Sequence, residues 1–103
     1  MIRYTSSAHL AVGEEVLWLR QEDYKLVGGV LCGVRERLGV SQQELARRLK
    51  KPQSFISSYE RGQRRIDLLE FLKIMNALGV DPLKVFAEIR SQFLPAKRGL
   101  VRR

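Results

Sequence analysis

Apolar residues recur every three or four positions over much of residues 22–89, the spacing typical of amphipathic helices. The first such segment, residues 22–38, places Val27, Val30, Leu31, Val34 and Leu38 on one broad face. A second segment follows Val40, a third follows Pro52, a fourth covers residues 68–78 and a fifth begins at Pro82. The pattern predicts an all-α fold with five helices.

The second and third segments form a pair of short helices joined by a tight turn, VSQQELARRLKKPQSFISSYERG in residues 40–62. Ser41 precedes Glu44 by three residues, which predicts a reciprocal capping box at the start of the first helix. Proline is tolerated in a first helical turn, and the residue before it avoids the α region. We therefore expect one helix to end near Lys50 and the next to begin at Pro52.

The later helices carry clear end signals. Asp67 and Glu70 predict an N-terminal cap, Gly79 predicts a C-terminal cap, and Asp81 followed by Pro82 predicts the start of the last helix. The helix over residues 68–78 is apolar on so much of its surface that we expect it at the centre of the domain.

The second helix of the pair has a polar, uncharged face opposite its inward residues Ile56 and Tyr59. That face consists of Gln53, Ser54, Ser57 and Ser58. Glutamine can bond adenine with two hydrogen bonds, and serine can serve several bases. Such a face, followed directly by a cluster of arginines, favours binding in a DNA groove, with the arginines beside the phosphates.

Charge supports a polyanionic partner. The chain of 103 residues has a net charge of +8, and residues 1–40 contribute nothing to it, with five basic and five acidic side chains. Residues 41–65 hold seven basic and two acidic side chains. An excess concentrated on the helix pair is the electrostatic pattern of a nucleic-acid-binding domain.

Other chemistry finds little support. The single cysteine, Cys32, suits a reducing cytoplasm, and with the single histidine, His9, it is too little for a metal site. The sequence contains no catalytic pairing of a nucleophile with histidine and no glycine-rich phosphate loop. We expect no secretion signal, because the N-terminal residues lack a basic start and a long apolar core, and no apolar run reaches the length of a membrane span. We expect a cytoplasmic protein that is not an enzyme and needs no cofactor.

The helix pair resembles the helix-turn-helix of the Cro and phage-repressor family, the XRE-like regulators. Numbered from Gln42, the family's apolar positions four, eight, fifteen and eighteen are Leu45, Leu49, Ile56 and Tyr59, and its small fifth residue is Ala46. The ending Tyr-Glu-Arg-Gly and the surrounding residues 24–89 are also similar to that family. Two positions depart from it: Lys50 stands where glycine is common, and Lys51 where an apolar residue is usual.

The resemblance implies a residue-by-residue assignment. Gln53, Ser54, Ser57 and Ser58 would read bases, and Arg35 would pair with Glu60 behind the motif. Gln42 resembles the family residue that touches the DNA backbone, and Arg61, Arg64, Arg65 and the amide of Gly62 would hold phosphates. Lys50, Lys51 and Arg47 or Arg48 are weaker candidates for backbone contact, and the two lysines are suggested by their charge and not by the resemblance. Leu83, Phe86 and Ile89 would form a homodimer interface. These roles imply a sequence-specific transcriptional regulator, by default a repressor that binds a palindromic operator in double-stranded DNA.

We divide the chain into an N-terminal extension (1–21), a helix-turn-helix domain (22–90) and a basic C-terminal tail (91–103). The apolar residues Val16, Leu17, Trp18 and Leu19 of the extension either pack on the domain or contact a protein partner, and we favour the first. Two alternative functions stay open: an antitoxin that binds both a toxin and its own promoter, and a protein-interaction adaptor on the same fold.

Overall fold

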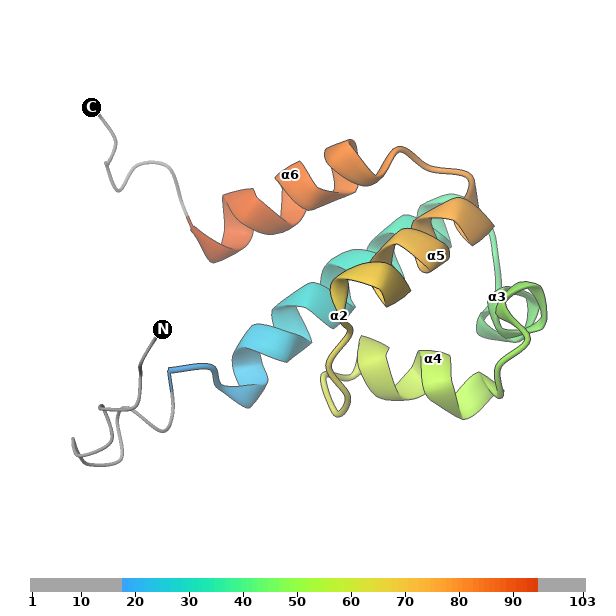
Figure 1. The fold of residues 1–103 in the computed structure, drawn as a ribbon, viewed down its shortest axis with the longest axis horizontal. Coiled ribbons are helices and arrows are strands. Elements are labelled where there is room, and N and C mark those ends of the chain that lie inside the picture. The colour runs from blue at the N-terminus through green and yellow to red at the C-terminus, as the bar shows by residue number, and fades with distance from the viewer. Residues whose placement is uncertain (1–17, 95–103) are drawn as a thin grey trace.

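The computed structural model describes residues 18–94, which contain five helices and no strand. The helices are α2 (Gln21–Arg37), α3 (Gln42–Leu49), α4 (Gln53–Glu60), α5 (Leu68–Leu78) and α6 (Pro82–Phe93) (Figure 1). The predicted all-α, five-helix fold is confirmed. Among the described residues, no helix is long and apolar enough to cross a membrane.

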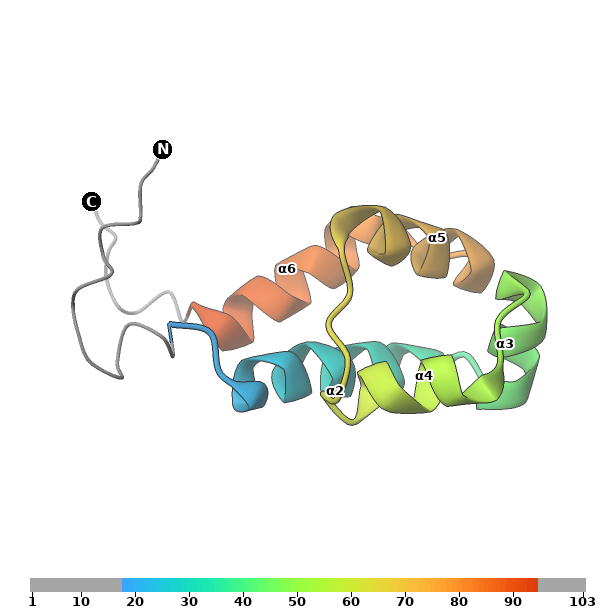
Figure 2. The same ribbon diagram turned by 60° about the horizontal axis from the view of Figure 1, so that its bottom comes forward.

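The helices form two layers. Figure 2 shows α2 and α4 side by side in one layer, α5 and α6 in the other, and α3 closing one end. The side chains that are fully buried between the layers come from four helices: Leu31, Leu45, Ile56, Tyr59, Ile74 and Met75. Of the two motif helices, α4 therefore packs on α2 and α3 packs on α5, and the two also pack on each other.

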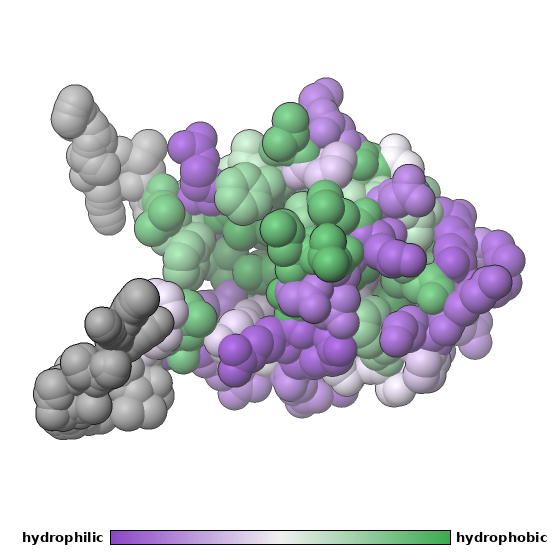
Figure 3. Space-filling view, in the orientation of Figure 1, coloured by the Kyte–Doolittle hydropathy of each residue, from purple (hydrophilic) through white to green (hydrophobic). Residues whose placement is uncertain are grey.

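Helix α5 buries only one stripe of its surface. Ile74 and Met75 are fully buried, but Leu68 and Leu69 are 69% and 70% exposed. The expectation that this helix lies at the centre of the domain holds for one face only, because Leu68, Leu69 and Leu72 on the rest of its surface are exposed. Figure 3 shows the resulting apolar surface over α5 and α6.

Most helix ends follow the predicted caps. Asp67 and Glu70 form a reciprocal capping box on α5, and Gly79 ends that helix in the left-handed conformation. The box predicted for α3 is only half formed: the Ser41 hydroxyl accepts a hydrogen bond from the Glu44 amide at 3.0 Å. The Glu44 carboxylate accepts hydrogen bonds from two arginines of its own helix instead of returning to the cap.

The turn between α3 and α4 is left-handed at Lys50, with φ 57° and ψ 44°. Lys50 therefore adopts the conformation that glycine would favour, at a cost of about 1 kcal/mol relative to glycine. Pro52 is the extended N-cap residue of α4, one position before the helix in which it was expected.

Helix α2 approaches α4 closely at Gly28. A Cβ placed there would lie 2.1 Å from the carbonyl oxygen of Tyr59 and 2.6 Å from that of Glu60. Only a glycine allows this distance between the two helices. The last turn of α4 consequently rests directly on the backbone of α2.

The ends of the domain differ from the expected boundaries. Residues 91–93, which we assigned to the tail, belong to α6, and the helix stops just before Pro95, which disfavours helical conformation at Leu94. Trp18 is 80% exposed and does not pack on the domain as expected. Leu38 lies just beyond α2 and is 46% exposed, so it leaves the buried face of that helix. The predictions for residues 1–17, including His9, fall outside the described residues.

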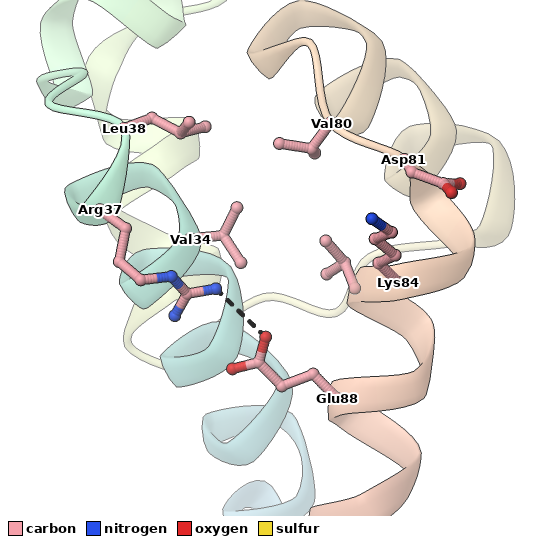
Figure 4. Close-up of a pocket in the computed structure, with 8 residues that line it drawn as sticks. Val34, Arg37, Leu38, Val80, Asp81, Lys84 and Glu88 are labelled. Carbon is pink, nitrogen blue, oxygen red and sulfur yellow. Dashed lines mark hydrogen bonds and ion pairs between the residues drawn. The ribbon is translucent and has the colours of Figure 1, made fainter.

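A shallow cavity of about 350 Å³ separates the end of α2 from the start of α6 (Figure 4). Arg37 and Glu88 cross it with an ion pair at 3.2 Å, and both side chains are partly in solvent. The pair ties α6 to α2 on the side of the domain formed by these two helices.

Candidate nucleic-acid interface

The polar face of α4 presents its first two residues most openly. Gln53 and Ser54 are exposed, whereas Ser57 and Ser58 are half-buried. The Ser58 hydroxyl donates to the carbonyl oxygen of Ser54 at 2.7 Å, and the Ser57 hydroxyl accepts a hydrogen bond from Arg61. The face exists as predicted, and its two earlier residues are the freest to meet a ligand.

Gln53 is held by a chain of hydrogen bonds that runs into the protein. Its side-chain amide donates to the Gln42 oxygen at 3.1 Å, and the Gln42 amide donates to Glu60 at 2.8 Å. Glu60 in turn accepts two hydrogen bonds from Arg35, at 2.7 and 3.0 Å. Side chains from α2, α3 and α4 thus converge behind the first exposed residue of α4.

The Arg35–Glu60 pair that the resemblance implied is present and buried. The two side chains are 9% and 4% exposed, and Arg35 also donates to the carbonyl oxygen of Val40 at 2.8 Å. Burial alone would raise the pKa of Glu60, but hydrogen bonds from Arg35 and Gln42 outweigh it and hold that pKa below its usual value. Glu60 therefore stays a carboxylate, and the pair fixes the end of α4.

The other side of α4 is organised around Phe55. Its ring lies edge-on to Tyr59, with ring centroids 5.5 Å apart. The Lys51 ammonium lies 5.4 Å and the Arg64 guanidinium 4.7 Å from the centre of the Phe55 ring. Arg64 also forms a two-pronged ion pair with Glu70, with both hydrogen bonds at 3.0 Å.

The remaining cations near the motif differ in how far they are already engaged. Arg61 donates to Ser57 and to Gln63, and Arg65 lies over the ring of Tyr24 at 5.4 Å. Lys50 is exposed and forms no ion pair within residues 18–94. These side chains, with Lys51, line both ends of α4.

The weaker candidates Arg47 and Arg48 both bind Glu44. Hydrogen bonds from Arg47 and then Arg48 lower the pKa of Glu44 to about 2. Arg48 also donates to the carbonyl oxygen of Ala77 at 2.9 Å. Each arginine of this cluster thus shares one carboxylate, which reduces the positive charge it offers a phosphate.

Gly62 does not present a free amide. Its N–H donates to the carbonyl oxygen of Tyr59 at 3.1 Å, and the residue is buried with φ +76°. A Cβ at this position would lie 2.5 Å from a side-chain carbon of Lys25. Gly62 therefore closes α4 against α2, and its amide is occupied within the protein.

The expected dimer residues lie on α6, with unequal exposure. Leu83 and Phe86 are 76% and 56% exposed, whereas Ile89 is half-buried and packs partly against the core. Leu68 and Leu69 of α5 add exposed apolar surface that the sequence pattern had placed inside the domain.

Two features of this region were not predicted from the sequence. The helical pattern assigns Phe55 no role, although an aromatic residue four positions after Lys51 and nine before Arg64 could have suggested stacking. Glu70 was assigned as a cap and also binds Arg64. The described residues contain no cluster of three histidine, cysteine, aspartate or glutamate side chains that could hold a metal ion.

A family model described as helix-turn-helix matches residues 34–85, which include α3, α4 and α5. The chain is 33% identical over 61 residues to an uncharacterized HTH-type transcriptional regulator of Sinorhizobium fredii, covering 59% of this chain and 79% of that protein. An XRE-family like protein from Pseudomonas syringae pv. tomato has a similar structure, with TM-score 0.62, 34% identity, and coverage of 69% and 87%. The restriction-modification controller protein C.AhdI from Aeromonas hydrophila gives TM-score 0.59, 34% identity, and coverage of 63% and 98%.

Proposed function

The chain belongs to the helix-turn-helix family of XRE-like, DNA-binding transcription regulators, and from that premise we propose that it recognises a specific operator through α4. Gln53 and Ser54 read base edges in the major groove, and Ser57 and Ser58 contribute from the next turn. The observation that carries the proposal is the exposed polar face of α4, whose first residue, Gln53, is oriented by the hydrogen bond that its amide donates to Gln42.

Phosphates are held at both ends of α4. Lys50 and Lys51 lie before the helix, and Arg61 and Arg65 follow it, all of them exposed. Gln42 accepts the hydrogen bond that orients the base-reading amide of Gln53. From this position beside Gln53, Gln42 also contacts the DNA backbone. Arg64 is the less available cation because Glu70 already neutralises it. Contacts of this kind set the register of the helix in the groove.

The protein acts as a homodimer on a palindromic site. Leu83 and Phe86 give α6 an exposed apolar face, and Ile89 continues it toward the core. A two-fold dimer presents two copies of α4 to half-sites about one helical turn apart. Binding at such a site near a promoter obstructs RNA polymerase, so repression is the proposed mode of regulation.

The test is fluorescence anisotropy with DNA from upstream of the protein's own gene and with scrambled DNA, at several salt concentrations. The double variant Gln53→Ala, Ser54→Ala is compared with the matched control Gln92→Ala, Ser91→Ala, which removes the same residue types from exposed positions of α6. We expect the natural fragment to bind about a thousandfold more tightly than scrambled DNA.

The α4 variant should lose about ten- to a hundredfold of this preference while its salt dependence is retained, because bases and not phosphates lose their partners. The α6 control should bind like the unmodified protein. Equal and weak binding of both DNAs by the unmodified protein would reject sequence-specific recognition and leave only an electrostatic surface.

A further inference from the structure

Phe55 lies in the first turn of α4, and the guanidinium of Arg64, from the loop that follows the helix, lies over its ring. The side chain is half-buried and packs against the core, with its ring edge-on to Tyr59 at 5.5 Å between centroids. Buried Tyr59 cannot move without disturbing the core, so the Phe55 ring has a fixed support. A fixed aromatic face attracts cations within about 6 Å of its centre.

Both cations on this ring meet that criterion, but their other contacts differ. The guanidinium of Arg64 binds both oxygens of Glu70 and the carbonyl oxygen of Arg65 at 2.9 Å. Glu70 itself caps α5 through Asp67. Arg64 is thus bound to the α4–α5 loop and to α5, and it acts as a brace that holds the loop against the ring.

Lys51 is bound on one side only. Its ammonium lies 5.4 Å from the ring centre, and it forms no ion pair within residues 18–94. It stands in the turn that leads into α4, two residues before Gln53. The hydrogen-bond donors of this ammonium therefore stay available to a ligand that meets the start of α4.

We propose that Phe55 is a positioning residue for DNA binding: its ring, braced by Arg64, holds the Lys51 ammonium beside the start of α4 for a phosphate of the bound strand. This inference rests on the proposed function. A free lysine side chain has four rotatable bonds and loses their freedom when it binds. A ring that restricts the lysine beforehand reduces that loss, so the gain appears as affinity for any DNA sequence.

The experiment compares Phe55→Leu, Phe55→Tyr and Lys51→Gln on the natural and scrambled DNA fragments, with Trp18→Leu, an exposed aromatic residue before α2, as the control. Phe55→Leu should lower the affinity for both DNA fragments by the same factor, about two- to fivefold, and leave the ratio of the two affinities unchanged. Phe55→Tyr keeps an aromatic face and should bind like the unmodified protein. Lys51→Gln should lower the slope of log affinity against log salt by about one.

The decisive measurement is Phe55→Leu in the Lys51→Gln background. If Phe55 acts through Lys51, Phe55→Leu causes no further loss of DNA affinity in a protein that already carries Lys51→Gln. A lower ratio of natural to scrambled binding in Phe55→Leu, or a full additional loss in the Lys51→Gln background, would overturn the proposal and make Phe55 a structural support of α4. Circular dichroism of each variant confirms that it is folded.

The two hypotheses fail separately. If the unmodified protein binds both DNAs alike, the proposed regulator function fails, while the coupling of Phe55 to Lys51 can still be measured on scrambled DNA. If the unmodified protein prefers the natural fragment but the two residues are not coupled, only the positioning role of Phe55 is rejected.

Discussion

The two sides of α4 are held by different kinds of interaction. The inner flank, formed by Arg35, Gln42 and Glu60, is a buried network of directional hydrogen bonds among three helices. The outer flank, formed by Phe55, Lys51, Arg64 and Glu70, combines an aromatic ring with partly exposed charges. Buried charges are costly when one partner is lost, whereas exposed pairs contribute little to stability. The inner flank should therefore govern folding, and the outer flank should govern attraction to DNA.

The largest expected effect comes from Glu60→Ala. It leaves the Arg35 guanidinium buried without its carboxylate and should lower the free energy of unfolding by about 3–5 kcal/mol. Glu88→Ala breaks the exposed pair with Arg37 and is the matched control, with an expected cost below about 1 kcal/mol. Urea unfolding measures both.

A double variant tests whether the unpaired buried charge causes this loss of stability. Replacing both partners, Arg35→Met with Glu60→Leu, should be less destabilising than Glu60→Ala, because no buried charge remains unpaired. Equal costs for Glu60→Ala and Glu88→Ala would contradict the view that the inner flank carries the stability of α4.

Two neighbouring glycines of α2 test how closely the inner flank is packed. Gly28→Ala places a methyl group 2.1 Å from the Tyr59 carbonyl oxygen and should destabilise the protein by about 1–3 kcal/mol. Gly29→Ala meets nothing within 4 Å and should stabilise the same helix by roughly 0.5–1 kcal/mol. Thermal unfolding compares them, and a loss of stability in both variants would indicate a general intolerance of α2.

Each flank contains one glutamate with a lowered pKa, Glu60 in the inner flank and Glu70 in the outer flank, so the pH dependence of stability compares the two flanks. The pKa of Glu60 is lowered in the folded protein against the opposing effect of burial, and the pKa of Glu70 is lowered chiefly by Arg64. Each group contributes stability above its unfolded pKa of about 4.3, and this is lost as the pH falls toward the folded value.

The free energy of unfolding should therefore decrease as the pH is lowered below about 5. Glu60→Gln should flatten this decrease more than Glu70→Gln does, because the Glu60 carboxylate accepts its hydrogen bonds from Arg35 and Gln42 out of solvent, whereas solvent screens the exposed Arg64–Glu70 pair. Denaturant titrations at a series of pH values provide the comparison. A larger flattening by Glu70→Gln would reverse the assignment of the two flanks.

The sequence predicted the inner flank better than the outer one. Helix periodicity placed Ile56 and Tyr59 inside, and the family resemblance paired Arg35 with Glu60 across 25 residues. The outer flank depends on where the irregular loop after α4 carries Arg64, and no periodic pattern specifies that path. The stacking of Lys51 and Arg64 on the Phe55 ring was therefore not predicted, although all three residues are visible in the sequence.

Competition between local partners explains the other differences. Glu44 could close a capping box, but two arginines within four residues offer charged donors, and these prevail over the backbone amide. Apolar spacing alone could not show that Leu68 and Leu69 stay exposed, because that depends on how α6 is oriented after the turn at Gly79. Local signals therefore located the helix ends, and long-range packing decided which apolar faces are covered.

The smallest expected effect is the difference in stability between variants of Lys50 and Lys51, two adjacent lysines of the turn. Lys50 has φ 57°, so Lys50→Gly should relieve its backbone strain and stabilise the protein by up to about 1 kcal/mol. Lys51 has no positive φ, so Lys51→Gly gains no such relief and should destabilise the protein by roughly 0.5 kcal/mol. Thermal unfolding and salt-dependent anisotropy on the same samples measure both properties.

Both variants should bind DNA more weakly, since each removes a cation near the start of α4. Each should also reduce the slope of log affinity against log salt by about one. Lys50→Gly would then be more stable and yet bind DNA more weakly, which a general distortion of the turn cannot produce. If Lys50→Gly gains stability but keeps its salt slope, Lys50 contacts no phosphate. Phosphate binding before α4 would then depend on Lys51, the lysine that the Phe55 ring holds in place.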